Sequence, residues 1–346
     1  MLVSVKRSRQ SSTVINIRFH MNLLLIKTSS LGDVIHMLPA VSDAVKAIPD
    51  LRIDWLVEQS FAAIPAWHPG VGQVIPIAVR RWKKHLTSLS TWQHIAAVRS
   101  TLRSHSYDMI LDSQGLLKSA IWTWMANGPA VGYDRYSIRE PLASWFYDRR
   151  LSVSRNQHAI DRNRQVMAQA FGYKLPSSGP DYGLQGLSNR LPAPGIAIPP
   201  GSVIGLHGTS RPDKLWPVEN WVLLAQKLGA IHRTLVLPWG NEEERQRAEY
   251  IANHSPAVQV LPRLGLDALA CILDQSQAAI GVDTGLLHLA AALGKPGLAL
   301  YTATPPALTG AVSDRHAASA LRNLSSPQEL QASSVIDALM TTLYKC

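Results

Sequence analysis

The first residues that could do chemistry follow an apolar run, Leu23 to Ile26, that is typical of a buried strand. Ser29 and Ser30 carry hydroxyls, Gly32 allows a backbone to approach closely, and Asp33 stands at the start of a predicted helix. Ligands of open α/β sheets bind at the carboxyl ends of strands, which is where this turn falls. Asp33 would also serve well as a simple helix cap, so a ligand role and a capping role both stay open.

A second set of polar residues lies in the loop after a strand expected at 203–207. Thr209 and Ser210 offer hydroxyls, and Lys214 offers a cation shortly before the next helix. Such groups can hold phosphate oxygens, although an ordinary loop with a solvated lysine has the same composition. Glu244, in the first turn of a later helix, could contact a ligand or merely compensate the helix dipole.

The strongest pattern is the run from Asp283 to His288, where an apolar strand stops and a helix opens at Thr284 and Gly285. Backbone N–H groups at such a helix start point at an anion, and the Asp283 carboxylate could accept hydrogen bonds from sugar hydroxyls. His288 follows Thr284 by about one helical turn, so both could face one ligand. The alternatives are a helix cap for Asp283 and a hydrogen-bonded core histidine for His288.

Basic residues are concentrated in two blocks of the sequence. The formal net charge is +10, and residues 1–20 hold four bases and no acid. Residues 59–107 hold six bases and no acid, centred on the run Arg80, Arg81, Lys83 and Lys84. A localised patch of this kind indicates one polyanionic partner, although a solvated surface segment is the alternative. Arg139 and His158 are weaker candidates for the same surface.

The absence of other motifs excludes several classes of protein. No G-x-G-x-x-G fingerprint or P-loop occurs, which argues against a dehydrogenase or a P-loop ATPase. Only two cysteines are present, and no H-E-x-x-H or Asp-x-Asp motif is found, so we expect neither a disulfide framework nor a metal site. No apolar run approaches the ~18 residues of a membrane span. The N-terminus is not a signal peptide by pattern.

The motifs are spaced along an alternation of short apolar strands and amphipathic helices, which predicts a parallel α/β architecture. The expected helices lie near 33–46, 90–104, 115–126, 218–229, 242–252, 266–274, 285–293 and 326–343. The expected strands are at 22–27, 52–58, 73–78, 108–112, 203–207, 234–238, 258–261, 278–282 and 297–301.

A Pro- and Gly-rich stretch divides this alternation into two series, so we predict two Rossmann-like domains facing each other across a cleft. The first domain is expected at 21–180, the linker at 181–202 and the second domain at 203–325. Residues 326–346 are expected to form a C-terminal helix that could pack back on the first domain. We expect residues 1–20 to be a disordered arm or a start-site artefact outside the fold.

Taken together, these segments resemble the ADP-heptose:lipopolysaccharide heptosyltransferases, glycosyltransferase family 9, and most of all the members that add the first heptose. The resemblance spans almost the whole chain from Met21. Six segments carry it in the family's order: 27–34, Arg80 to Lys84, Arg139 to Ser144, Asp213 to Pro217, Leu237 to Gly240, and Val282 to Leu289.

The resemblance implies a GT-B fold, with the acceptor site in the first domain and the donor site in the second. It implies inverting transfer of L-glycero-D-manno-heptose from ADP-L-glycero-β-D-manno-heptose to the 5-hydroxyl of the first Kdo of Kdo2-lipid A. The resemblance also implies that catalysis requires no metal and no cofactor, ADP-heptose being a substrate. The enzyme would lie in the cytoplasm, peripherally on the cytoplasmic face of the inner membrane.

The resemblance also assigns residues to roles. Asp33 matches the catalytic base, and Lys214 would stabilise the charge that develops on the departing ADP. Donor-binding positions are Thr209, Ser210, Lys214, Glu244, Leu264, Asp283, Thr284, Gly285 and His288. Acceptor-side positions are Ser29, Ser30, Gly32, Arg80, Arg81, Lys83, Lys84, Arg139 and His158. Ser210 replaces an expected threonine and Leu264 a familiar methionine, and both keep the chemistry of the position.

Two alternatives remain beside this interpretation. Heptosyltransferase II adds to a heptose, and the 28–33 run with the Arg80–Lys84 block favours the first-heptose enzyme over it. A basic nucleic-acid-binding protein would fit the isoelectric point of about 9.7. That class requires a recognition helix or interleaved aromatic motif, which the sequence lacks, so we expect no nucleic-acid partner.

Overall fold

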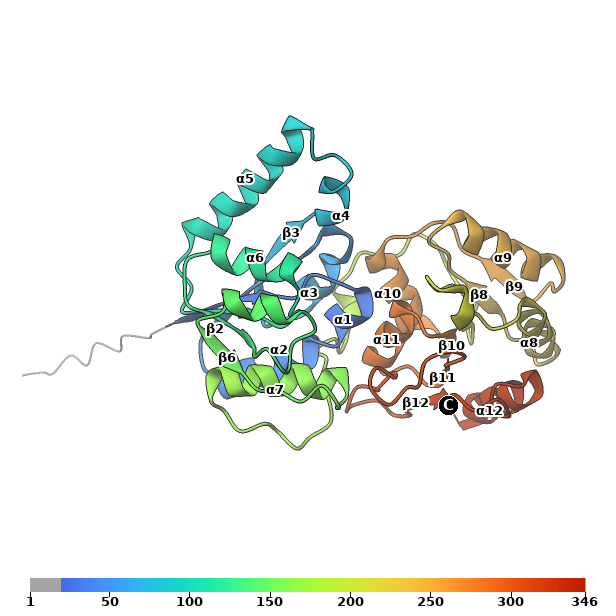
Figure 1. The fold of residues 1–346 in the computed structure, drawn as a ribbon. Helices are drawn as coiled ribbons and strands as arrows, with labels where there is room; N and C mark the ends of the chain where they lie inside the picture. The colour runs from blue at the N-terminus through green and yellow to red at the C-terminus, as the bar shows by residue number, and fades with distance from the viewer. Residues whose placement is uncertain (1–19, 346) are drawn as a thin grey trace, which may run out of the picture.

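Two six-stranded parallel sheets organise the chain in the computed structural model, which describes residues 20–345 (Figure 1). The first sheet consists of β1 (Met21–Ile26), β2 (Leu51–Glu58), β3 (Val71–Ile77), β4 (Met109–Asp112), β5 (Ala130–Tyr133) and β6 (Arg149–Leu151). The second consists of β7 (Val203–Leu206), β8 (Leu235–Leu237), β9 (Val258–Val260), β10 (Ala278–Val282), β11 (Gly297–Leu300) and β12 (Leu321–Leu324).

Both sheets have the doubly wound strand order of a Rossmann fold. The first runs β3-β2-β1-β4-β5-β6, and the second repeats that order as β9-β8-β7-β10-β11-β12. The order therefore reverses beside β1 in one sheet and beside β7 in the other, and ligands bind at these switch points. The predicted α/β class with two Rossmann-like units is confirmed.

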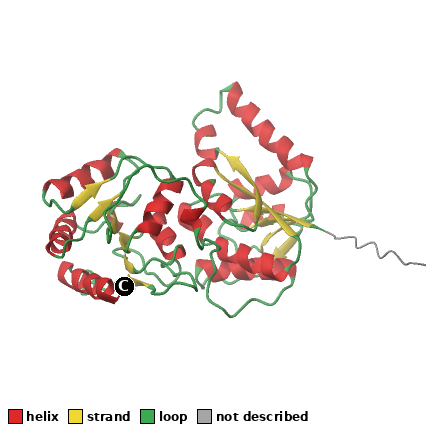
Figure 2. Cartoon of the chain, turned by 180° about the vertical axis from the view of Figure 1, so that it is seen from behind, coloured by secondary structure: helices red, strands yellow, loops and turns green. Residues whose placement is uncertain are grey.

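Helices cover both faces of each sheet (Figure 2). In β1, Leu23 and Leu25 join one core cluster while Leu24 and Ile26 join another, as expected of a strand buried on both faces. The first unit contains α1 (Leu31–Ile35), α2 (Leu38–Ala47), α3 (Ala63–Trp67), α4 (Val79–Trp82), α5 (Leu89–Ser104), α6 (Leu117–Met125) and α7 (Ala159–Phe171). The second contains α8 (Val218–Ala230), α9 (Glu242–Asn253), α10 (Leu266–Gln275), α11 (Gly285–Ala292) and α12 (Ala332–Lys345).

The helix expected at 33–46 is two helices, α1 and α2, separated at His36 and Met37. Pro39 lies in the first turn of α2, and because proline has no N–H it cannot continue an upstream helix. Three elements between 126 and 176, β5, β6 and α7, were not predicted, and neither was β12. β6 exposes Arg149 and Arg150, so it lacks the apolar signal of a strand.

The sequence left open whether the C-terminal helix packs back on the first unit, and in the structure it does not. It contacts α8 and β11, and Val335, Leu339 and Leu343 complete the core of the second unit. The helix also begins at Ala332, later than the expected 326. Glu329 turns back to accept hydrogen bonds from the backbone N–H groups of Ser325 and Ser326, so these residues form a turn ahead of the helix.

The segment 176–202 crosses between the two sheets as a packed connection. Tyr182 and Leu187 are buried, and the Tyr182 hydroxyl donates to the carbonyl of Val312 in the second unit. Asp181 forms ion pairs with Lys46 of α2 and with Arg315 of the second unit. These contacts tie both units to the connection.

Two further predictions concern the N-terminal segment and the absence of a membrane span. The segment 1–20 lies, apart from His20, outside the described residues. Within 20–345, each helix is too short or too polar to traverse a lipid bilayer.

Candidate active site between the two units

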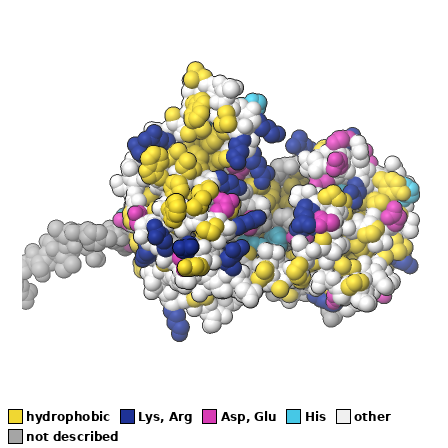
Figure 3. Space-filling view, viewed as in Figure 1, with side chains coloured by type: hydrophobic (Ala, Val, Ile, Leu, Met, Phe, Trp, Pro, Cys, Tyr) yellow, Lys and Arg dark blue, Asp and Glu magenta, His cyan; other side chains and the backbone are white. Residues whose placement is uncertain are grey.

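The two units meet where α1 packs against α11, and Figure 3 shows a hollow above this junction. The contact is close, because a Cβ added to Gly285 would lie 2.8 Å from Leu31 Cβ, and one added to Gly32 would lie 2.9 Å from His288 Cδ2. Only glycine leaves room for this approach. The predicted acceptor turn and the predicted donor helix therefore face each other directly.

Asp33 both caps its helix and keeps an oxygen available. Its Oδ2 accepts hydrogen bonds from the Ser30 N–H at 2.7 Å and the Ser30 hydroxyl at 3.0 Å. Its Oδ1 accepts no hydrogen bond from the described residues. The two alternatives drawn from the sequence are thus compatible, since one oxygen fixes the carboxylate and the other can take a proton.

Asp283 is the centre of a polar cluster at the end of β10. Its Oδ2 lies 2.6 Å from Lys214 Nζ and accepts a hydrogen bond from the Thr304 hydroxyl at 2.7 Å. The Thr209 hydroxyl donates to the Asp283 backbone carbonyl at 3.0 Å. Lys214 is 18% exposed and Asp283 is 11% exposed, so this ion pair is largely shielded from water. Asp283, which is remote from Lys214 in the sequence, therefore holds the Lys214 ammonium group where a diphosphate could bind it.

His288 is a buried histidine of the junction. Its Nδ1 lies 3.1 Å from Nε2 of His36, which comes from the first unit, and its Nε2 lies 3.9 Å from Asp283 Oδ1. Burial lowers the pKa of His288 to about 4, against the opposing effect of Asp283 and Asp33. Burial and the neighbouring His288 also hold the pKa of His36 well below its usual range. Both imidazoles are therefore neutral at pH 7 and bridge the two units.

A cavity of about 360 Å³ opens beside this cluster, at the carboxyl ends of β7 and β8. Predicted residues Glu244, Leu264 and Thr284 line it. Trp239 also lines the cavity, and its indole N–H donates to the Leu261 carbonyl at 2.6 Å, which holds the ring in place. Glu244 Oε2 accepts from the Gly240 N–H at 2.7 Å. A flat apolar group with a polar edge fits such a lining.

The basic block lies on the first-unit side of the site, where Figure 3 shows Lys and Arg side chains along the edge of the hollow. Arg80 and Lys83 line a small cavity of about 70 Å³ together with Thr28 and Ser29. Arg81, Lys84 and Arg139 are exposed but do not line this cavity.

His158 is placed differently. It begins α7, and its Nε2 lies 3.0 Å from the carbonyl oxygen of Gly310 in the second unit. Its ring centroid is 5.8 Å from that of His36. His158 thus belongs to the histidine junction between the units.

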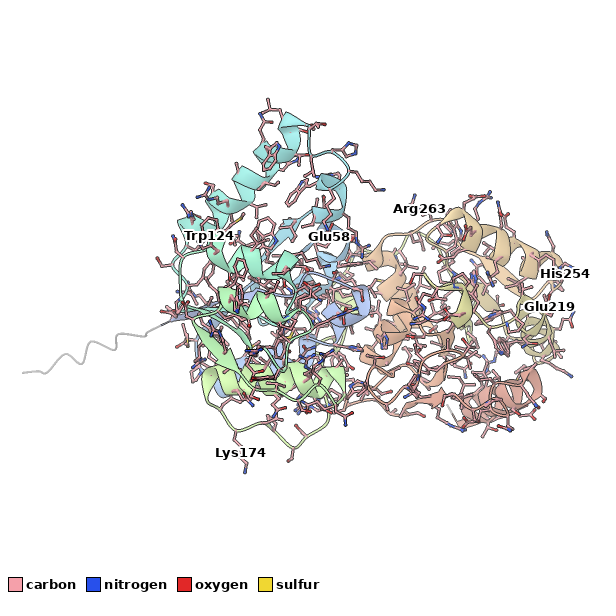
Figure 4. All side chains as sticks on the ribbon, in the orientation of Figure 1. Glu58, Trp124, Lys174, Glu219, His254 and Arg263 are labelled. Carbon is pink, nitrogen blue, oxygen red and sulfur yellow. The ribbon has the colours of Figure 1, made fainter. Side chains whose placement is uncertain are left out.

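Besides His36 and Thr304, three further residues of the site were missed from the sequence. Lys118 donates from Nζ to the Ser29 hydroxyl at 3.0 Å. Glu58 accepts from the N–H groups of Val79 and Arg80 at 3.2 and 3.3 Å, so it positions the start of the basic block. Arg263 lines the larger cavity, and Figure 4 shows Glu58 and Arg263 on opposite sides of the hollow.

A topological signal could have found Lys118. β4 pairs with β1, so the loop after β4 must lie beside the loop that carries Ser29. Glu58 and Arg263 have no comparable signal in the sequence. Among the residues of known placement, no three His, Cys, Asp or Glu side chains are grouped so as to hold a metal ion.

Comparison with known proteins identifies relatives of the chain. The family model described as glycosyltransferase family 9 (heptosyltransferase) matches residues 95–338. Lipopolysaccharide heptosyltransferase 1 of Pseudomonas aeruginosa is 47% identical over 292 residues, which cover 84% of this chain and 81% of that protein. The protein of the same name from Escherichia coli K12 is 41% identical, with 84% and 90% covered.

Solved structures agree with these matches. Escherichia coli heptosyltransferase WaaC with ADP is 38% identical, with a TM-score of 0.85, and the match covers 94% of this chain and 99% of that chain. The same enzyme with ADP-2-deoxy-2-fluoro heptose gives a TM-score of 0.82 over 93% and 99%. Escherichia coli ADP-heptose lps heptosyltransferase II, at 19% identity and a TM-score of 0.74, shares the fold.

Proposed function

Because the chain belongs to glycosyltransferase family 9, the heptosyltransferases, and is a glycosyltransferase, we propose that it moves L-glycero-D-manno-heptose from ADP-heptose to the first Kdo of Kdo2-lipid A. The observation that carries this proposal is the position of Asp33, whose free Oδ1 lies on the α1 side of the junction with the Asp283 cluster on the other. Relatives named heptosyltransferase 1, at 41–47% identity, favour the first-heptose reaction over that of heptosyltransferase II.

The second unit binds the donor. The adenosine occupies the cavity beside Trp239 and Leu264, which supply apolar surface for the base. The diphosphate lies at the helix start formed by Thr284 and Gly285 and takes Lys214 as its counter-ion. A relative solved with ADP, 38% identical to this chain, supports this assignment.

The first unit binds the acceptor. The Kdo carboxylates and the lipid A phosphates are anionic, and they meet Arg80, Lys83 and Lys118 around the small cavity beside Ser29. Arg81, Lys84 and Arg139 add positive potential farther out, which attracts the acceptor without fixing it. Glu58 keeps the basic block in place through the backbone of Arg80.

The reaction is a single displacement. The acceptor oxygen attacks the anomeric carbon while Asp33 Oδ1 removes the hydroxyl proton. The bond between that carbon and the β-phosphate oxygen breaks, and ADP leaves with the electron pair. Lys214 and the helix start of α11 stabilise the negative charge that grows on ADP. Because the acceptor oxygen attacks the face of the anomeric carbon opposite the departing ADP in one displacement, the configuration of that carbon inverts.

Two further parts of the proposal concern the membrane and the role of metal ions. The acceptor is anchored in a membrane by its lipid, so the enzyme works on the cytoplasmic face of the inner membrane and associates with it peripherally. We also propose that catalysis needs no metal ion, because Lys214 and the α11 helix start supply the positive charge that the leaving diphosphate requires.

The test is incubation of the purified protein with ADP-heptose and Kdo2-lipid A in the presence of EDTA, followed by mass spectrometry. The addition of one heptose is the expected result. A parallel reaction with heptosyl-Kdo2-lipid A separates the alternatives, because modification of that acceptor alone would make the protein a heptosyltransferase II. Activity that EDTA abolishes and Mg²⁺ restores would contradict the metal-free mechanism.

A further inference from the structure

The first unit carries an unusual number of exposed apolar side chains on neighbouring elements. In α6, Leu117, Ile121 and Trp124 are 41%, 41% and 70% exposed. Their spacing of four and three residues places them on one face, while Ala120 and Trp122 point into the core. An amphipathic helix of a globular domain normally turns its apolar stripe inward, so α6 has a second apolar stripe that no element of residues 20–345 covers.

Exposed apolar side chains also occur on two elements that contact α6. The 3₁₀ helix η2 (Pro141–Phe146) exposes Leu142 by 52% and Trp145 by 75%, and it contacts α6. α5 also contacts α6, and at its start, at the tip of the first unit in Figure 1, Leu89 is 72% exposed and Trp92 56% exposed. Figure 3 shows apolar side chains gathered over this side of the first unit. We call the exposed side chains of these three segments the apolar face: Leu86, Leu89, Trp92, Leu117, Ile121, Trp124, Leu142, Trp145 and Phe146.

The segment that carries the apolar face has a clear excess of positive charge. Residues 80–150 contain eleven Lys or Arg and five Asp or Glu, and all eleven bases are exposed. None of these bases forms an ion pair with residues 20–345. The five acids instead accept hydrogen bonds from backbone N–H groups: Asp108, Asp112, Asp134, Glu140 and Asp148.

Aromatic and aliphatic side chains within a field of lysine and arginine match the surface of an anionic bilayer. Tryptophan favours the boundary between headgroups and acyl chains, and basic residues attract the anionic headgroups. A protein partner of ordinary composition would bring no comparable density of negative charge.

The apolar face is also close to the acceptor side of the site. Lys118, whose Nζ reaches Ser29, and Trp124 belong to the same helix, separated by six residues or ~9 Å along the axis. Because Leu117, Ile121 and Trp124 lie along one side of α6, this separation runs along the bilayer surface when the apolar face docks, and the acceptor side of the site stays next to the membrane.

We propose that the apolar face, with its basic surroundings, docks the enzyme on an anionic lipid bilayer. This inference rests on the proposed function, because a lipid-anchored acceptor is what brings the enzyme to a membrane. Trp92 is prepared for the contact, since its indole N–H is bound to the Leu86 carbonyl at 2.9 Å and its ring stays exposed.

The experiment measures binding of the full chain to vesicles without either substrate. Vesicles of equal parts phosphatidylethanolamine and phosphatidylglycerol are compared with phosphatidylcholine vesicles in a flotation assay. The wild type is expected to bind the anionic vesicles more tightly. The double variant Trp124→Ser/Trp145→Ser should need at least ~10-fold more lipid for half-maximal binding, because it loses two interfacial anchors.

Two controls separate a lost anchor from a lost fold. Tyr344→Ser removes an aromatic ring that is 80% exposed on α12, far along the chain, and should leave vesicle binding unchanged. Trp124→Phe/Trp145→Phe keeps two large apolar rings and should retain most of the binding. Melting temperatures of all variants are expected to equal that of the wild type, because the substituted side chains are exposed.

Three outcomes would overturn the inference: wild type that does not bind anionic vesicles, a Trp→Ser double variant that binds as the Tyr344→Ser control does, or a double variant that changes the oligomeric state in sedimentation. The last result would make the face a contact between copies of the chain. Failure of the proposed function is detected separately, with a deacylated, water-soluble Kdo acceptor that needs no membrane. If the wild type transfers no heptose to this acceptor, the proposed function is wrong. The double variant should transfer heptose to this acceptor at the same rate as the wild type.

Discussion

At the scale of single residues, Asp33 combines a structural and a chemical task in one carboxylate. Asp33→Asn keeps an oxygen that accepts from Ser30, so the helix cap and the binding of ADP should survive. The substitution removes the base, and kcat should fall by ~10²-fold or more, since a positioned base typically contributes that much. Steady-state kinetics and ADP titration check this. A variant with nearly wild-type kcat would reduce Asp33 to a helix cap.

Lys214 is held by Asp283 before any ligand arrives. Lys214→Ala should lower both kcat and ADP affinity, because it removes a cation that meets growing charge and leaves the Asp283 carboxylate 11% exposed and unpaired beside the diphosphate. The double variant Lys214→Ala/Asp283→Asn should therefore recover part of the ADP affinity but not the kcat. Calorimetric titration of ADP measures the recovery. Equal ADP affinity in the single and double variants would show that Asp283 does not repel the ligand.

The buried histidines make stability depend on pH. The pKa of His288 is lowered to about 4 in the folded protein, below its unfolded value, so the unfolded chain binds the proton more readily. The stabilisation is full above pH 6.5 and is lost as the pH falls from there towards 4, by about 2 kcal/mol at pH 5 for one such group. Urea denaturation at pH 7.5 and pH 5 checks the sign for the wild type.

His288→Asn removes this titrating group and should flatten the pH dependence by about that amount. His36, whose pKa burial holds well below its usual range, and His68 and His207, whose pKa values burial lowers to about 4, remain and account for the residual slope. An unchanged slope in the variant would mean that His288 is protonated equally in both states.

At the scale of elements, the close approach of α1 and α11 sets the geometry of the site. Gly285→Ala would place a Cβ against Leu31 and push the helices apart, so we expect a loss of ~1–3 kcal/mol of stability together with lower activity. Gly72→Ala is the matched control, because its Cβ would lie 3.7 Å from its nearest neighbour, at ordinary contact distance. Thermal unfolding of both variants tests the packing. Equal melting temperatures would show that the junction yields without cost.

In the whole molecule, the basic residues of the first unit are proposed to bind the anionic acceptor, and Lys214 of the second unit is proposed to bind the diphosphate of the donor. Arg80→Ala/Lys83→Ala should raise the acceptor KM with little effect on ADP affinity, because these bases meet charges that are present before and during the reaction. The effect should shrink at high salt, since exposed charges are screened within about 8 Å at physiological ionic strength. Kinetics with the deacylated acceptor at two salt concentrations measure it.

The matched control for this charge change is Lys227→Ala/Arg322→Ala, which removes two exposed bases from the second unit. It should leave the acceptor KM unchanged. If the control raised KM as much as the Arg80/Lys83 variant does, net charge rather than the small cavity would attract the acceptor.

Much of the fold and of the site could be predicted locally. Apolar runs such as Leu23 to Ile26, followed by small and polar residues, identify strand ends, and in a parallel sheet those ends share one edge. The placement of Asp33, Lys214 and Asp283 at such ends follows from the sequence alone. Short strands with exposed arginines, such as β6, have too few apolar residues to be predicted from the sequence in this way.

Local sequence patterns thus predict the two α/β units, the strand ends that carry polar groups, and the concentration of positive charge in the first unit. Which of these groups come into contact became clear from the folded structure. It placed His36 beside His288, 252 residues away, brought Lys118 to Ser29, and packed α12 on the second unit. It also showed that the stripe ending at Trp124 stays uncovered. The physical reason is that periodicity and propensity act over a few residues, whereas such contacts depend on strand pairing and on the docking of two units.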